Sequence, residues 1–75
     1  MNINKEQCKM ARAALGLGVR DLAHLAKVSP NTVTRFERGE TLQPRTIEAL
    51  RSALEGAGVS FIDGNGDGAG VRLRH

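Results

Sequence analysis

The stretch VRDLAHLAKVSPNTVTRFERG, residues 19–39, predicts two short helices joined by a tight turn. In its first half, leucine and alanine recur at the spacing of an amphipathic helix, with an apolar face formed by Leu22, Ala23, Leu25 and Ala26. Ser29 and Pro30 mark the start of a second helix, because serine is a favoured N-cap and proline is tolerated at the first helical position. Gly39 ends this helix, since glycine readily adopts the left-handed conformation found there.

The second of these helices, residues 30–38, has a narrow apolar face and a broad polar one. Val33 and Phe36 are three residues apart, so they share one face and anchor the helix. The other faces carry short polar or basic side chains, namely Asn31, Thr32, Thr34, Arg35 and Arg38. A helix of this composition is suited to presenting its outer surface to a partner.

The order and spacing of these residues resemble the helix-turn-helix of the lambda repressor and Cro-like (XRE) family of DNA-binding regulators. The matching residues are Leu15-Gly16, Leu22-Ala23, Val28-Ser29, Thr32-Val33, Phe36, Glu37 and Gly39. The resemblance covers roughly residues 3–54. Two positions depart from the family pattern. Val19 stands where a phosphate-binding Gln is common, and Lys27 stands where the turn usually has Gly, although a left-handed non-glycine residue costs about 1 kcal/mol.

The resemblance implies that helix 30–38 enters the major groove of DNA, where base edges carry a readable hydrogen-bonding code. Asn31 is then expected to bond adenine and Arg35 guanine, while Thr34 or the ring of Pro30 contacts a thymine methyl group. The residues expected to hold phosphates, or to reach either phosphate or base, are Ser29, Thr32, Lys27, Arg38 and Arg45. The alternative for each residue is an ordinary solvated side chain.

The resemblance also implies a structural ion pair between Arg12 and Glu37. A partly buried, bidentate contact of this kind would fix the DNA-reading helix against the rest of the domain. The alternative is that the two side chains are solvated independently.

Two further helices are expected to complete the core. The first spans residues 5–15, with Asn4 and Gln7 at the spacing of a capping box. Its inward stripe comprises Cys8, Ala11 and Leu15, with Ala14 beside it. The last helix begins at Pro44, after a loop over residues 40–43, and its inward residues are Ile47, Leu50, Ala53 and Leu54.

The C-terminal tail, residues 59–75, differs in composition from residues 1–58, which we assign to the helix-turn-helix domain. Two short β-prone runs, residues 59–62 and 71–74, flank a glycine-rich segment and predict a hairpin. A lone two-stranded hairpin is marginal in water, so it must pack on the helices or on another chain. We expect a homodimer interface formed by Val59, Phe61, Ile62, Val71 and Leu73. The alternative is packing on the chain's own helices alone.

Charge is unevenly distributed along the 75 residues. Residues 1–39 hold seven basic and three acidic side chains, whereas residues 40–75 hold four basic and five acidic ones. Excess positive charge on the helix-turn-helix suits a polyanionic partner such as DNA, although ordinary surface solvation explains it equally well. A single cysteine and no long apolar run lead us to expect a cytoplasmic, nucleoid-associated protein.

No pattern of residues indicates catalysis, a cofactor or a metal. Asp63, Asn65 and Asp67 match the first half of a calcium-binding EF-hand loop, but Arg74 occupies the position of the closing glutamate. The histidines and Cys8 lack metal-ligand spacing. We therefore expect a non-enzyme without cofactors and, at this length, without a small-molecule ligand.

The expected fold is mainly α: a four- to five-helix, lambda-repressor-like DNA-binding domain with a short C-terminal β-hairpin or strand pair used for dimerisation. The predicted function is that of a sequence-specific regulator of transcription, a repressor from a bacterium or phage. It would bind a palindromic operator as a homodimer, with two reading helices about 34 Å apart. The alternatives are a protein-binding module, such as an antitoxin-like or bridging partner, and a structural dimerisation piece.

Overall fold

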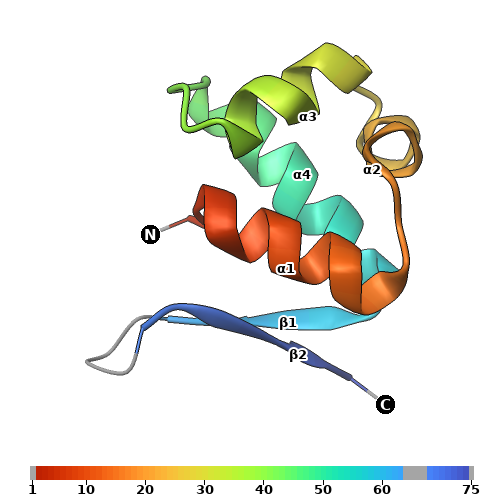
Figure 1. Ribbon diagram of the computed structural model, residues 1–75, viewed down its shortest axis with the longest axis vertical. Helices are drawn as coiled ribbons and strands as arrows, with labels where there is room; N and C mark the ends of the chain where they lie inside the picture. The colour runs from red at the N-terminus through yellow and green to blue at the C-terminus, as the bar shows by residue number, and fades with distance from the viewer. Residues whose placement is uncertain (1, 64–67, 75) are drawn as a thin grey trace.

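The computed structural model describes residues 2–63 and 68–74 of the chain. Its elements, in chain order, are α1 (Lys5–Leu15), α2 (Val19–Ala26), α3 (Pro30–Glu37), α4 (Pro44–Ala57), β1 (Val59–Ile62) and β2 (Gly70–Leu73). Figure 1 shows α3 at one end of the molecule and the two strands at the other, with α1 and α4 between them. The expected mainly helical fold with a C-terminal strand pair is confirmed.

The capping residues behave as their types predict. The Asn4 side chain accepts a hydrogen bond from the Gln7 backbone N–H at 2.8 Å, and the Gln7 side chain accepts one from the Asn4 N–H at 2.9 Å. This is a complete capping box, which satisfies two N–H groups that the helix itself cannot. Ser29 likewise accepts from the Thr32 N–H at the start of α3.

The turn between α2 and α3 depends on Lys27, the only described non-glycine residue with a positive φ, at 59°. Its N–H bonds the carbonyl oxygen of His24, and the N–H of Val28 bonds that of Ala23. Lysine thus adopts the left-handed conformation that glycine would take, at a cost of about 1 kcal/mol. After α3, which ends one residue earlier than expected, Gly39 takes the predicted positive φ, at 99°.

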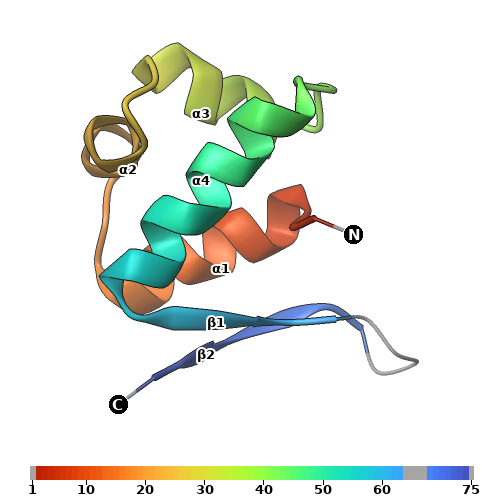
Figure 2. The ribbon, with the colours of Figure 1, turned by 180° about the vertical axis from the view of Figure 1, so that it is seen from behind.

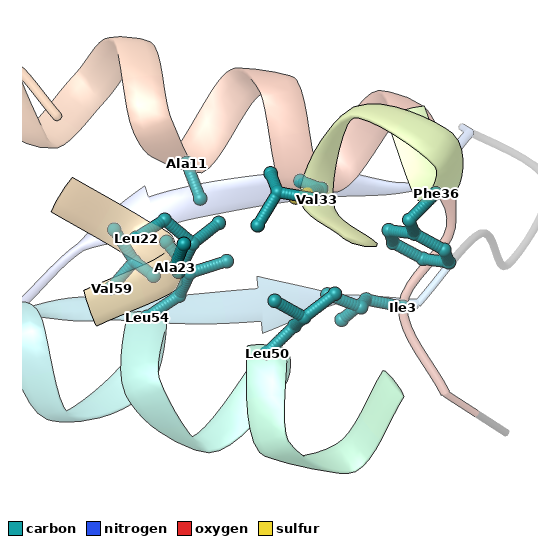
Figure 3. Packing of buried hydrophobic residues seen from close by; sticks show 10 residues of the cluster. Ile3, Ala11, Leu22, Ala23, Val33, Phe36, Leu50, Leu54 and Val59 are labelled. Carbon is teal, nitrogen blue, oxygen red and sulfur yellow. The ribbon is translucent and has the colours of Figure 1, made fainter. Parts of the chain in front are cut away.

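All four helices and β1 contribute side chains to one core (Figure 3). Its members are Ile3, Cys8, Ala11, Leu22, Ala23, Val33, Phe36, Leu50, Leu54 and Val59. Two sequence-based expectations about burial are wrong. Ala14 and Leu25 are exposed, because Cys8 and Ala11 already fill the inward side of α1, and Leu22 and Ala23 that of α2.

The two strands pair antiparallel, with Phe61 opposite Val71 and Val59 opposite Leu73. They lie against α1 and α4 on the side away from α3 (Figures 1 and 2). Phe61 and Val71 pack against the core of the same chain. Val59 is completely buried, so its assignment to an interface between chains is wrong: no surface of it remains for a partner.

The strand boundaries also differ slightly from the expectation. β2 ends at Leu73, and Arg74 follows it with a backbone N–H bond to the Gly58 carbonyl oxygen at 3.0 Å. The Arg74 guanidinium donates to the Glu55 carbonyl oxygen at 2.7 Å, near the C-terminus of α4. Asn65 and Asp67 of the calcium-loop resemblance lie outside the described residues. Within residues 2–63 and 68–74, no cluster of potential metal ligands is present.

Candidate nucleic-acid interface

The outward face of α3 carries most of the side chains that were expected to contact DNA. Asn31 and Thr34 are exposed, and the Arg38 side chain keeps 63% of its surface accessible. Thr32 and Arg35 are half-buried. Ser29 and Pro30 lie exposed at the start of the helix. Polar groups on successive turns therefore share a surface that no other element covers.

The inward face of α3 is fixed by apolar contacts and one ion pair. Val33 and Phe36 are buried in the core, as expected. Arg12 donates to both carboxylate oxygens of Glu37, from Nε to Oε2 and from Nη2 to Oε1, each at 2.7 Å. The bidentate geometry confirms the pair that the family resemblance implied. It joins α1 to the last turn of α3 and so restrains the helix against rotation.

Two further contacts complete this ion pair. The Cys8 thiol donates to Glu37 Oε2 at 3.2 Å, and Arg12 Nη1 donates to the Leu17 carbonyl oxygen at 3.2 Å. Glu37 is only 9% exposed, so these partners compensate for the removal of its charge from water. No buried side-chain nitrogen or oxygen in the described part of the chain lacks a hydrogen-bond partner.

Burial and pairing shift the pKa values of the three groups. Burial by itself raises the pKa of Glu37, but the hydrogen bonds from Arg12 and Cys8 outweigh it and hold that pKa below its usual value. The bond to Glu37 raises the pKa of Arg12. Burial, followed by the bond to Glu37, raises the pKa of the Cys8 thiol to about 12. At neutral pH the group therefore holds a carboxylate, a guanidinium and an unreactive thiol.

Hydroxyl groups near the start of α3 are partly committed to local hydrogen bonds. Ser29 Oγ and Thr32 Oγ1 lie 2.9 Å apart and form a hydrogen bond in which either hydroxyl can be the donor. Thr34 Oγ1 donates to the carbonyl oxygen of Pro30 at 3.2 Å. The hydroxyl proton of Thr34 is thus engaged, which leaves its methyl group as the available apolar contact.

Arg35 and Arg38 share an acidic neighbour that the sequence reasoning did not identify. Arg35 Nε donates to Glu40 Oε1 at 2.9 Å, and Arg38 Nη2 lies 3.5 Å from Glu40 Oε2. Glu40 lies just beyond the end of α3, in a segment that the sequence predicts only as a loop. The signal available in the sequence was the close spacing of two arginines and one glutamate around Gly39.

Lys27 and Arg45 lie outside α3. Lys27 is exposed in the turn before it, and Arg45 is exposed in the first turn of α4. Neither forms an ion pair with any residue among 2–63 and 68–74. Both cations are therefore free of competing carboxylates in the described part of the molecule.

Comparison with known proteins agrees with this arrangement. A family model described as a helix-turn-helix domain matches residues 6–60, most of the chain. A comparison with curated proteins finds no match. None of the helices in the described segments is long and apolar enough to cross a membrane. The chain belongs to the helix-turn-helix domain family, within the lambda repressor-like (XRE) class of DNA-binding domains.

Proposed function

We propose that this protein is a sequence-specific regulator of transcription that inserts α3 into the major groove of double-stranded DNA. The observation that carries the proposal is the division of α3 into two faces. Val33, Phe36 and Glu37 are buried and hold the helix in place, while the opposite face presents exposed polar side chains. The major groove accepts a single helix, and polar side chains there read base edges.

Each outward side chain has a role that suits its chemistry. Asn31 suits adenine, and the guanidinium of Arg35 suits the O6 and N7 atoms of guanine. The Thr34 methyl group and the Pro30 ring suit a thymine methyl group. Lys27, Arg38 and Arg45 are proposed to contact the phosphate backbone. The hydroxyl groups of Ser29 and Thr32 suit either a phosphate or a base.

We further propose that the protein binds a near-palindromic operator as a homodimer. The hairpin lies at the opposite end of the molecule from α3 (Figures 1 and 2). Contact through the far face of the hairpin would point two α3 helices in opposite directions. Contact through a strand edge, with the twofold axis running from hairpin to α3, keeps both helices on the side that faces DNA. Exposed strand edges readily pair in this way.

The exposed apolar side chains of the hairpin are Ile62 on β1 and Leu73 on β2, which are 40% and 44% exposed, so each strand carries one such side chain that a partner can cover. We therefore expect that changing both to glutamate produces monomers in sedimentation equilibrium. Leu25→Glu is the matched control, because Leu25 is also exposed but lies on α2. A double variant that remains dimeric would place the interface elsewhere.

A dimer seated on an operator would act as a repressor by occupying the promoter. Helix-turn-helix families are typically non-enzymatic, and we infer the same for this chain, with a place at the nucleoid in the cytoplasm. No cofactor or small-molecule ligand is part of this proposal.

The direct test is selection of bound duplexes from a random-sequence pool. We expect enrichment of a near-palindrome with half-sites about one helical turn apart. The affinity for that site should fall steeply with salt, since phosphate contacts release counterions. Failure to enrich any sequence, together with salt-insensitive retention on duplex DNA, would overturn the proposal and favour a protein-binding module.

A further inference from the structure

The end of α3 places Glu40 beside the DNA-reading side chains. Gly39 adopts a positive φ, its N–H bonds the Phe36 carbonyl oxygen at 3.0 Å, and the N–H of Glu40 bonds the Arg35 carbonyl oxygen at 3.1 Å. These two bonds form a Schellman motif, which reverses the chain over the last turn of the helix. The backbone of Glu40 is therefore fixed, and its side chain returns towards α3.

The Glu40 carboxylate uses both of its oxygens on arginines of the outward face. One oxygen accepts from Arg35 Nε at 2.9 Å, and the other lies 3.5 Å from Arg38 Nη2. The hydrogen bond from Arg35 also lowers the pKa of Glu40, so the carboxylate is ionised at neutral pH. Among the described residues, it is the only acidic side chain paired with an arginine of α3's outward face.

The geometry leaves the reading atoms of Arg35 free. Because Glu40 uses Nε, the two terminal nitrogens, Nη1 and Nη2, remain available for an end-on bidentate contact with guanine. All three side chains are at least two-fifths exposed, and ion pairs of this kind contribute little to folding stability. An effect of Glu40 should therefore be visible in DNA binding rather than in folding.

We propose that Glu40 is a positioning residue that sets the balance between specific and non-specific DNA binding. It holds the Arg35 guanidinium in the orientation for base reading, and its negative charge weakens the attraction of Arg35 and Arg38 for phosphates of any sequence. The proposal rests on the DNA-binding function proposed above. It assigns the discrimination between operator and random DNA partly to a residue outside the reading helix.

The two actions of Glu40 can be separated with two variants. Glu40→Asp keeps the charge but shortens the side chain, so the carboxylate no longer reaches Arg35 Nε. Glu40→Gln keeps the length and an accepting oxygen but removes the charge. Asp63→Asn is the charge-matched control, because Asp63 is exposed and directly follows β1, in the part of the chain away from α3.

The probes are the duplex selected by the wild-type protein, the same duplex with each base pair changed in turn, and a random-sequence duplex. A good bidentate contact favours the correct base over a wrong one by about 5- to 150-fold. We expect Glu40→Asp to reduce this preference by about threefold to tenfold at one base pair. We expect Glu40→Gln to bind random DNA about fivefold to tenfold more tightly, with a salt slope steeper by about one unit, since one more cation is free for phosphate. Asp63→Asn should change neither quantity.

A double-variant cycle with Arg35→Ala tests whether Glu40 acts through Arg35. In the Arg35→Ala background, Glu40→Asp should no longer alter base preference, because non-additivity is expected of residues in direct contact. If both Glu40 variants keep the wild-type base preference and salt slope while the wild-type protein selects an operator, the Glu40 proposal alone is wrong. If the wild-type protein selects no sequence, the proposed DNA-binding function is wrong.

Discussion

The two ends of the molecule use polar side chains in opposite ways. At the α3 end, Asn31 and Arg38 extend outward, and no other element covers them. At the hairpin end, polar side chains tie the chain to itself. The Gln7 amide donates to the carbonyl oxygens of Ile62 and Gly70 at 3.0 and 3.1 Å, and Arg74 bonds the end of α4. One end leaves polar side chains exposed, whereas the other uses them to close the fold.

Helix α1 connects these two ends. Gln7 reaches the hairpin, while Cys8 and Arg12 reach Glu37 on α3. Side chains of one helix thus fix the strands on one side and α3 on the other. The hairpin is therefore tied to the helices through α1, and a division of the chain at residue 58 separates residues that are in direct contact.

Removal of residues 59–75 should have the largest effect on stability. It removes Val59, Phe61 and Val71 from the core. We estimate that this loss of apolar burial lowers the free energy of unfolding by about 3–6 kcal/mol. A chain of this length is stable by only about 4–11 kcal/mol. We expect circular dichroism to show loss of most of the helical signal at 37 °C. Arg72→Ala, an exposed change on β2, is the control and should leave the melting midpoint unchanged.

Truncation at residue 58 would damage the core and remove the proposed dimer interface at the same time. Monomers found after truncation would reflect a damaged core as well as a lost interface, so substitutions at Ile62 and Leu73 are the better test of dimerisation. A truncated chain that melts like the full chain would contradict the structural role of the hairpin.

Glu37→Ala should destabilise the fold by about 3 kcal/mol, because it leaves the Arg12 guanidinium without its charged partner. Urea denaturation measures the change. Glu6→Ala, on the exposed side of α1, should cost less than about 0.5 kcal/mol. Replacing both Arg12 and Glu37 with methionine should restore much of the loss, since a buried pair can often be exchanged for apolar side chains. Surface ion pairs contribute only roughly 0–1 kcal/mol. If Glu37→Ala lowers the free energy of unfolding by less than about 1 kcal/mol, the pair is not structural.

The same ion pair predicts how stability depends on pH. The pKa of Glu37 is lower in the folded chain than its ordinary 4.5, so its contribution is present above that value and is lost as pH falls through the folded pKa. The Cys8 pKa rises from 9.0 to about 12, so that contribution is present below 9.0 and is lost as pH rises towards 12. Denaturation midpoints should therefore decline on both sides of a plateau. In Glu37→Ala the acid decline should be shallower, and an unchanged acid decline would contradict the assignment.

Arg35→Ala should affect DNA binding without affecting the fold. We expect a loss of about 1–3 kcal/mol for the selected operator and a relaxed preference at one base pair. Competition binding against single-base variants of the operator measures both quantities. An unchanged base preference would show that Arg35 does not read a base.

Arg45→Ala should have the smallest effect. Loss of one phosphate contact weakens binding to all sequences alike and lowers the slope of affinity against salt by about one unit. Titrations at several salt concentrations measure the slope. A change confined to one base pair would instead assign Arg45 to base reading.

The local structure of the chain could be predicted from residue types because its causes are local. The Ser29 cap, the Asn4–Gln7 capping box and the left-handed Gly39 each involve residues at most three positions apart. Apolar spacing likewise predicted the burial of Val33, Phe36, Leu50 and Leu54. The Arg12–Glu37 pair was predictable only through resemblance to a family, since no local rule joins residues 25 positions apart.

Only the tertiary structure decided the remaining contacts, because they depend on how distant elements meet. Gln7 reads as a capping residue in the sequence, yet its amide also holds both strands of the hairpin. Val59 reads as one of several apolar strand residues, but the packing of α1 and α4 over the hairpin buries it completely. The sequence predicts only that Glu40 lies in a loop, whereas in the structure the Schellman turn brings its side chain back to Arg35. Sequence patterns specify which faces are apolar, whereas long-range contacts specify which of those faces are already occupied.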